Sequence, residues 1–257
     1  TPYEGLSAEE RRIERKFAAE LAADLEGMAK RYLAKFVNVL DRNNAQELSA
    51  DYAANRESRQ RWSVATLEPA GAFIDWLYAK RLREAAPGSI IIFNGGGQGS
   101  GKTTATQVFE QQGASRRAVV IMDGTLQNYS RSRMHFVAAL EAGHQVLVRY
   151  IFAPFDVAVP RILRRAAEEE GRIVPLRRAA EGHFQAPRTA LMLWEEFGGG
   201  DVPVEFRVID NSSAPALRDA SWLRQQLYES LDDVLNLGNT TAHEHLSASA
   251  GNAAYHE

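Results

Sequence analysis

The chain lacks cysteine and has no long apolar run. Its 257 residues include no Cys, which excludes a disulfide framework and a metal site built on thiolates. No apolar stretch approaches the length needed to cross a bilayer, and no signal peptide is visible. The sequence therefore predicts a cytoplasmic protein with no membrane partner.

An excess of charge of one sign is also missing. The chain carries 30 Lys and Arg against 33 Asp and Glu, which gives a formal net charge of −3. The basic pairs at 116–117 and 177–178 are too short to indicate a nucleic-acid-binding surface, so no nucleic-acid partner is expected. Hydrophobic content of 45% and charged content of 25% are typical of a globular enzyme.

Glycine, by contrast, is concentrated just after an apolar run. Residues 96–103 read Gly-Gly-Gln-Gly-Ser-Gly-Lys-Thr and match the phosphate-binding pattern G-x-x-x-x-G-K-[ST]. Residues 89–93 before them are typical of a buried strand, and residues 104–110 after them of a helix. This order suits the chemistry, because the glycines let backbone N–H groups point inward and the helix N-terminus adds positive potential.

The motif predicts a bound nucleotide, ATP or GTP, together with Mg²⁺. Lys102 would reach the β- and γ-phosphates, and the Thr103 hydroxyl would bind Mg²⁺. The residues expected to contact the nucleotide are Gly96, Gly97, Gln98, Gly99, Ser100, Gly101, Lys102, Thr103 and Thr104.

Apolar strands alternate with helical segments, which indicates an α/β fold with a mostly parallel sheet. We expect a three-layer fold of the P-loop kinase kind with five strands, at 36–41, 89–94, 118–123, 145–152 and 204–210. Residues 1–35 are expected to form a helical extension that begins with a capping box at Ser7, and residues 36–237 the P-loop kinase domain. A last helix is expected at 216–235, and residues 238–257 are predicted to be a flexible tail.

Three of the predicted strands end in an aspartate, at positions 41, 123 and 210. Ligands of such sheets bind beyond the carboxyl ends of the strands, so these side chains should converge beside the glycine loop. A single aspartate at a strand end is more often a turn or cap residue. Several of them around one phosphate loop favour a functional role for Asp41 and Asp123.

Two further segments give the sequence a resemblance to the zeta-toxin family of P-loop kinases. Residues 123–126, Asp-Gly-Thr-Leu, stand where that family carries Glu-Gly-Thr-Leu after a central strand. Arg164-Arg165 and then Arg172-Ile173-Val174-Pro175 resemble its lid, an arginine-bearing helix followed by Arg-x-x-Pro. In the family, two arginines of this lid contact the nucleotide and its phosphates.

The order of the parts differs from the family, which places a strand and a catalytic aspartate after the loop helix. Nothing between residues 104 and 118 resembles that segment, whereas residues 39–52, ahead of the loop, have its spacing. Asp41 falls on the first aspartate, Leu48 on the leucine and Tyr52 on the tyrosine of the family pattern. The resemblance therefore implies a permuted kinase, with this segment moved in front of the phosphate loop.

The resemblance implies transfer of the γ-phosphate of ATP to a hydroxyl of a small molecule, such as the nucleotide sugar UDP-N-acetylglucosamine. The expected catalytic residues are Asp41 as base, with Lys102, Arg165 and Arg172 supplying positive charge. Asp123 would bind Mg²⁺ or substrate, and Thr125 would bind substrate. Which of Arg164 and Arg165 faces the site stays open.

Departures from the family pattern at Asn43, Gln46 and Ala50 keep other functions open. One alternative is a kinase of nucleosides or polynucleotides, and another is a P-loop ATPase switch that regulates a partner. The resemblance also implies an antitoxin protein as a partner.

Overall fold

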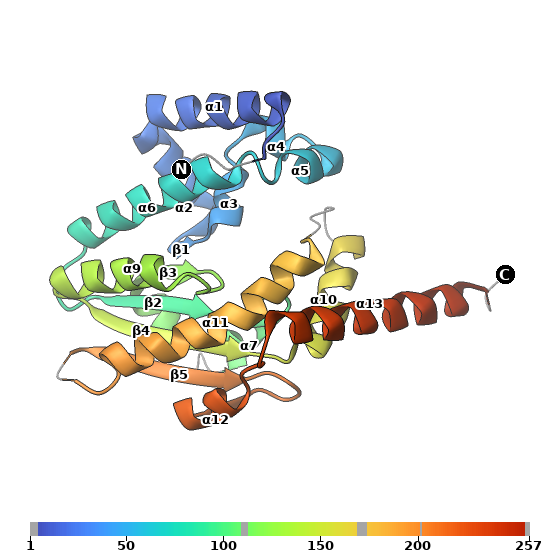
Figure 1. Ribbon diagram of the computed structural model, residues 1–257. Helices are drawn as coiled ribbons and strands as arrows, with labels where there is room; N and C mark the ends of the chain where they lie inside the picture. Colours follow the sequence, from blue (N-terminus) through green and yellow to red (C-terminus); the bar gives the residue numbers. More distant parts are fainter. Residues whose placement is uncertain (1–4, 109–112, 169–173, 201, 255–257) are drawn as a thin grey trace.

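The computed structural model describes residues 5–108, 113–168, 174–200 and 202–254 of the chain. It shows a central β-sheet with helices on both faces (Figure 1). The predicted α/β class and the mostly parallel sheet are confirmed. The described chain contains six strands rather than five.

The sheet order is β1-β3-β2-β4-β5-β6. The first five strands of the chain run parallel, and β6 is antiparallel to β5. The strands are β1 (Val39–Leu40), β2 (Ile90–Gly95), β3 (Ala118–Asp123), β4 (Gln145–Phe152), β5 (Val204–Asp210) and β6 (Ala216–Arg218).

The helices connect these strands and cover them. In the N-terminal half they are α1 (Ala8–Ala23), α2 (Leu25–Phe36), α3 (Arg42–Gln46), α4 (Ala50–Ala53), α5 (Arg56–Trp62), α6 (Leu67–Glu84), α7 (Lys102–Val108) and α8 (Ala114–Arg117). In the C-terminal half they are α9 (Tyr129–Glu141), α10 (Phe155–Glu168), α11 (Leu176–Phe197), α12 (Ala220–Gln225) and α13 (Leu231–Ala254). None of these described helices is both long enough and apolar enough to cross a membrane.

The N-terminal extension begins as predicted and then differs from the prediction. Ser7 and Glu10 form the expected capping box. The predicted single helix is divided at Asp24, because its side chain accepts a hydrogen bond from the amide of Gly27 at 2.9 Å and starts a second helix. The predicted strand 36–41 shrinks to Val39–Leu40, since α2 continues to Phe36.

Side chains of successive residues along each strand face opposite layers of the fold. On one face, Phe93, Val120 and Val148 pack with side chains of α6 and α9. On the other, Ile92 and Leu147 pack beside α8. Both faces of the central strands are covered, which explains their nearly continuous apolar runs.

The C-terminal region differs most from the prediction. Residues 216–218, expected in a helix, form β6, because Leu217 pairs with Ile209 in the antiparallel ladder. The helix α12 starts only after Asp219, whose carboxylate accepts a hydrogen bond from the amide of Trp222 at 2.8 Å.

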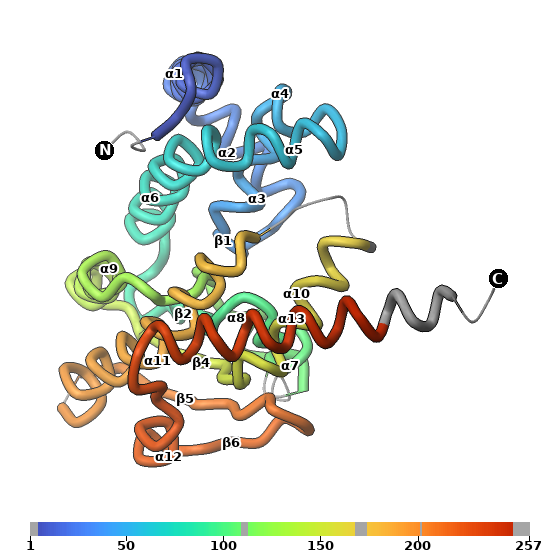
Figure 2. The backbone as a smooth tube through the Cα atoms, turned by 45° about the vertical axis from the view of Figure 1, so that its right-hand side comes forward, coloured from blue at the N-terminus to red at the C-terminus, as the bar shows by residue number. Residues whose placement is uncertain are grey.

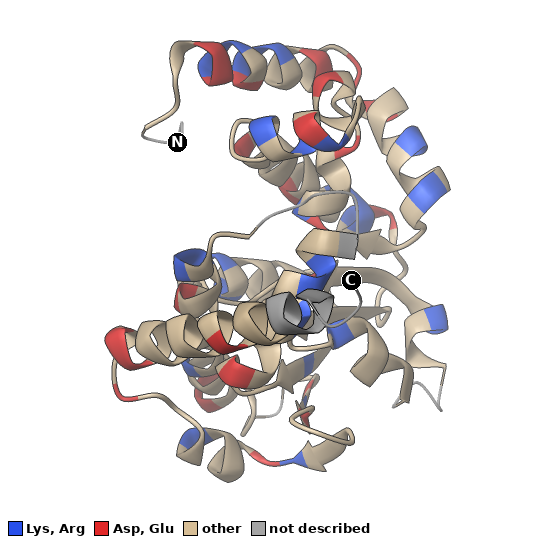
Figure 3. Ribbon diagram, turned by 90° about the vertical axis from the view of Figure 1, so that its right-hand side faces the viewer, with Lys and Arg blue, Asp and Glu red and all other residues tan. Residues whose placement is uncertain are grey.

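Residues from 238 onward, predicted to be a flexible tail, continue the helix α13 as far as Ala254. Val234 anchors the first part of this helix in a cluster with Phe155 and Val159 of α10. Figures 1 and 2 show α13 extending away from the layered part of the molecule. Basic and acidic residues are interspersed along α1 (Figure 3), as its sequence requires.

Candidate functional site

The glycine loop joins β2 to α7, as its sequence predicts. In the described part of the chain, the amides of Gly99, Gly101 and Lys102 donate to no protein acceptor. The Lys102 ammonium lies 3.2 Å from the carbonyl oxygen of Gly96, so the lysine folds back over the loop. Free backbone donors and one ammonium are what a phosphate group requires.

Two side chains from distant segments hold one side of this loop in place. Asn211, directly after β5, donates to the carbonyl of Ser100 at 2.7 Å. Arg161 of α10 donates to the carbonyls of Gly99 and Asn211 at 3.3 and 3.4 Å. Gly101 has a φ of +78°, and a Cβ there would lie 2.3 Å from the Asn211 amide nitrogen, so only glycine fits.

His183 of α11 braces the other side of the loop. Its Nε2 lies 2.8 Å from the carbonyl oxygen of Gln98, and its ring occupies the space that a Cβ on Gly97 would need. Burial lowers the pKa of His183 to about 4, so the ring is neutral at pH 7 and donates from Nε2 to that carbonyl.

Four polar residues form a row across neighbouring strands at the carboxyl edge of the sheet. Asn94 of β2 is in register with Asp123 of β3 on one side and with Arg149 of β4 on the other. Leu40 pairs with Met122, so Asp41 follows β1 at the level of Asp123. The row Asp41, Asp123, Asn94 and Arg149 therefore lies beside the beginning of the glycine loop.

The structure thus brings the two predicted aspartates and the predicted lysine to one edge of the sheet. Asp41 also caps α3, since its carboxylate accepts a hydrogen bond from the amide of Asn43 at 2.7 Å. The buried Tyr32 fixes the backbone around it, because its hydroxyl donates to the carbonyl of Val39 at 2.9 Å and accepts from the amide of Asp41 at 3.0 Å.

Burial and neighbouring charges both act on the carboxyl group of Asp123. Its Oδ1 is buried and has no hydrogen-bond partner among the described residues. Burial raises the pKa of Asp123 to about 6; Lys102 opposes this shift, and the nearby negative charge of Asp41 adds to it. A buried carboxyl group with an unpartnered oxygen can bind a cation that arrives with the nucleotide.

This perturbation predicts how the stability of the nucleotide-free protein depends on pH. The folded pKa of Asp123 is above the unfolded value, so its ionisation costs stability as pH rises from about 4 to about 6. We expect Asp123→Asn to raise the free energy of unfolding relative to wild type by more at pH 7.5 than at pH 4.5. The extra gain between these two pH values should reach about 2 kcal/mol, measured by denaturant unfolding.

Asp232, exposed near the start of α13, provides the matched control. Asp232→Asn should show no comparable gain in the free energy of unfolding at pH 7.5, because this side chain is not buried. A stability difference between Asp123→Asn and wild type that does not vary with pH would contradict the prediction.

A cavity of about 380 Å³ opens next to Asp123. Its walls come from the end of β1, the beginning of α3, the segment 122–128, and the helices α6 and α9. Thr125, predicted to bind substrate, lines it, and the Thr125 carbonyl accepts a hydrogen bond from the amide of Gly96 at 3.3 Å. The cavity therefore meets the glycine loop at the polar row.

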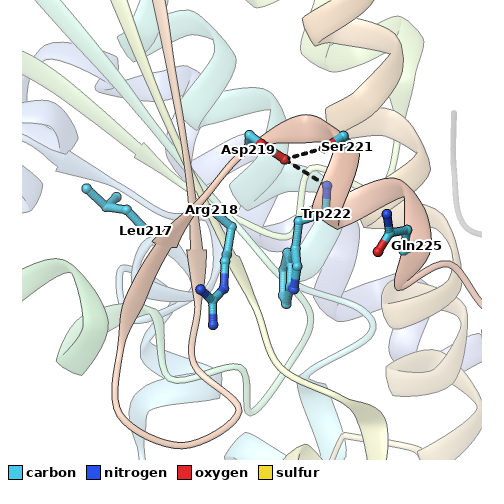
Figure 4. A pocket seen from close by; sticks show the side chains of 6 residues that line it. All are labelled: Leu217, Arg218, Asp219, Ser221, Trp222 and Gln225. Atoms are coloured by element: carbon cyan, nitrogen blue, oxygen red, sulfur yellow. Dashed lines mark hydrogen bonds between the residues drawn. The ribbon is translucent and has the colours of Figure 1, made fainter.

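A second pocket lies between β6 and α12, at the far edge of the sheet from β1 (Figure 4). Its lining contains no residue of the glycine loop or of the polar row, and it consists of Leu217, Arg218, Asp219, Ser221, Trp222 and Gln225. Figure 4 shows the Arg218 side chain beside the Trp222 ring, 5.5 Å from its centroid. This pocket is separate from the candidate active site.

The residues at the loop fit an Mg²⁺ ion. Thr103 is exposed at the beginning of α7, and Asp123 offers an unpartnered carboxylate oxygen. The described residues contain no cluster of three or more His, Cys, Asp or Glu side chains that could hold a metal alone. Mg²⁺ typically uses one or two protein oxygens and completes its shell with phosphates and water, which matches this sparse set.

The predicted lid is only partly placed. Arg164 and Arg165 are both exposed near the end of α10, so exposure does not distinguish them. Arg172 lies outside the described residues. Asp210, the third strand-end aspartate, binds Ser212 and Arg218 instead of facing the loop.

Several residues of the site were not singled out from the sequence. Arg149 had a visible signal, because it is a charged residue inside the apolar run 145–152. It is buried in the structure, and its Nε donates to the Asn94 side chain at 3.0 Å. Arg161, His183 and Asn211 had no comparable signal, since only the tertiary fold brings them to the loop.

No curated protein matches the chain. Among solved structures, two of the AvrRxo1-ORF1:-ORF2 complex, one native and one with ATP, are 11% and 12% identical, with TM-scores of 0.45 and 0.44. The matches cover 65% and 58% of this chain and 79% and 66% of those chains.

A structure from the PezAT chromosomal toxin–antitoxin system of Streptococcus pneumoniae is 13% identical, with a TM-score of 0.40, and the match covers 67% of this chain and 96% of that one. A family model matches part of the chain. It begins within α7, after the glycine loop, and ends at the N-cap of α12. Over residues 106–219, the chain is similar to the family described as Zeta toxin.

Proposed function

We propose that the protein is an ATP-dependent phosphotransferase that moves the γ-phosphate of ATP to a hydroxyl group of a small molecule. One observation carries the proposal: Asp41 follows β1 and Asp123 ends β3 at the same level, at the sheet edge where the glycine loop begins, and Asp123 lines a cavity of about 380 Å³. A kinase needs nucleotide and acceptor to meet beside such carboxylates.

In the proposed reaction, Asp41 accepts the proton of the acceptor hydroxyl as its oxygen attacks the γ-phosphorus. The bond from that phosphorus to the bridging oxygen breaks, and ADP leaves. Lys102 and the loop amides hold the phosphate oxygens, and Thr103 and Asp123 hold Mg²⁺. The bound Mg²⁺ would neutralise charge that develops on the phosphates.

The lid arginines belong to the same proposal. Arg165 and Arg172 would add positive charge at the γ-phosphate, as the family resemblance implies. Arg161 already contacts the loop from the same helix as Arg165, which supports an approach of α10 to the nucleotide.

The permuted order of the segments is also part of this proposal. Between α7 and β3 the described chain contains only the short helix α8 and no strand. The sheet position beside β3 is filled by β1, which comes from ahead of the glycine loop. This arrangement supports the inference that residues 39–52 supply the segment that the family places after the loop helix.

The test is an incubation of the protein with γ-labelled ATP and Mg²⁺, with UDP-N-acetylglucosamine in one arm and a small-molecule metabolite extract in the other. A new labelled species that needs both protein and extract or sugar supports the proposal. Release of labelled phosphate without a labelled acceptor would favour the ATPase switch. Labelling of nucleosides alone would make it a nucleoside kinase, and labelling in the sugar arm would identify a nucleotide-sugar kinase.

The antitoxin partner that the resemblance implies stays a prediction, as does the choice between ATP and GTP.

A further inference from the structure

Two arginines from different helices meet at one wall of the acceptor cavity. Arg42 begins α3 directly after Asp41, and Arg131 lies in the first turns of α9; both line the cavity. They approach each other over Gly71 of α6. A Cβ placed on Gly71 would lie 3.2 Å from Cδ of Arg42 and 3.4 Å from Nη2 of Arg131.

Glycine is costly at this position, because it lies inside an 18-residue helix where it costs about 1 kcal/mol relative to alanine. Its φ lies outside the left-handed region, so the backbone does not require it. The missing side chain instead gives room for the two arginines. The helix α6 is therefore less stable than it would be with alanine at position 71, and the space that glycine leaves allows two cations to lie close together.

The two guanidinium groups differ in their partners. Arg131 Nη2 lies 2.8 Å from both carboxylate oxygens of Asp75, and the same carboxylate contacts His135 at 3.0 Å. These contacts with Asp75 fix the position of the Arg131 guanidinium group. Among the described residues, the Arg42 side chain makes no hydrogen bond and no ion pair. Burial lowers the pKa of Arg42, and the positive charge of the neighbouring Arg131 lowers it further.

An unpaired, half-buried guanidinium beside a second arginine is unfavourable unless an anion joins them. Glu68 also lines the cavity and carries a charge of the right sign, but it makes no ion pair with Arg42. The space between these groups is part of the cavity, so a ligand can reach both arginines.

We propose that Arg42 and Arg131 form an anion subsite, and that the acceptor carries a phosphate or diphosphate group which this pair binds while its hydroxyl faces Asp41. This inference rests on the proposed phosphotransferase function for the role of the hydroxyl. The anion subsite itself is a property of the cavity. Arg42 directly follows the proposed base in the chain, so binding of the anion also fixes the distance from the acceptor to Asp41.

The experiment measures anion binding without catalysis. The glycine loop is first saturated with a non-hydrolysable ATP analogue and Mg²⁺, and inorganic pyrophosphate is then titrated by calorimetry. We expect wild type to bind one pyrophosphate, and Arg42→Gln to bind it about 10-fold to 100-fold more weakly, as for the loss of a hydrogen bond to a charged group. Arg42→Lys should lose less, because it keeps the charge.

Two further variants sharpen the result. Glu68→Gln should tighten pyrophosphate binding a few-fold, because it removes a negative charge from the same cavity. Arg83→Gln, at an exposed arginine near the end of α6, should change nothing. Unchanged affinity for the ATP analogue in each variant will show that the fold is intact.

Absence of pyrophosphate binding in wild type, or equal binding by Arg42→Gln, would overturn the anion subsite. So would a loss in Glu68→Gln as large as that in Arg42→Gln, because the two residues would then act as a pair for a different group. If no acceptor is ever phosphorylated but pyrophosphate binding depends on Arg42, the subsite stands and the phosphotransferase proposal fails.

Discussion

Replacement of Lys102 by alanine should abolish phosphoryl transfer, with a fall in turnover of about 10³-fold or more. The ammonium is the one charged side chain of the loop motif, and it folds back over the loop to lie 3.2 Å from the carbonyl of Gly96. Without it, the free amides of the loop would still contact the phosphates but could not offset the charge that develops in the transition state. Phosphorylated acceptor and ADP should be measured together by chromatography.

The fold should survive this substitution, because Lys102 makes a single hydrogen bond to the protein and is not buried. We expect the free energy of unfolding to change by less than about 1 kcal/mol. Lys30→Ala, at an exposed position of α2, is the matched control and should retain full activity. Activity of Lys102→Ala near that of wild type would refute the P-loop kinase assignment.

Replacement of Asp41 by asparagine should slow the transfer step by about 10²-fold to 10⁴-fold, the usual contribution of a general base. The substitution is close to isosteric, and asparagine caps helices as well as aspartate does, so α3 should keep its start. The affinity for ATP should change little, since Asp41 follows β1, which is separated by β3 from the strand that leads into the loop. The informative measurement is the single-turnover rate at saturating ATP.

Asp123→Asn provides the comparison, because Asp123 is level with Asp41 on the neighbouring strand. If Asp41 is the base, Asp123→Asn should mainly weaken the binding of Mg²⁺, so that a higher Mg²⁺ concentration is needed for the half-maximal rate. A loss of less than about 10-fold in Asp41→Asn, with a much larger one in Asp123→Asn at saturating Mg²⁺, would transfer the base role to Asp123. Asp232→Asn should behave as wild type in both assays.

The parts of the fold that depend on local chemistry were predictable from the sequence. The glycine loop requires its residues in consecutive order, and the buried strands around it form apolar runs that stand out from the helices. The parallel arrangement then brings strand ends to one edge, which is why Asp41 and Asp123 could be placed together before their positions were known.

The remainder depends on contacts between segments far apart in the chain. β6 is a strand only because β5 offers it an edge, and its three residues carry no strand signal of their own. Arg42 was not singled out from the sequence, and its proposed role came from Gly71 and Arg131, on two other helices. Such a constellation has no spacing in the sequence that could predict it.

The pairing of β1 with β3 has a consequence for biosynthesis. Leu40 leaves the ribosome before its partner Met122 exists, and at about 5–20 residues per second the delay is roughly 4–16 s. During that time α3 and α6, which wall the acceptor cavity, cannot pack beside β3, and closure of so long a loop also opposes the pairing of β1 with β3. In the nascent chain, the proposed base Asp41 and the helices α3 and α6 are therefore not yet assembled beside the phosphate loop. The active site is completed only once β3 has been made.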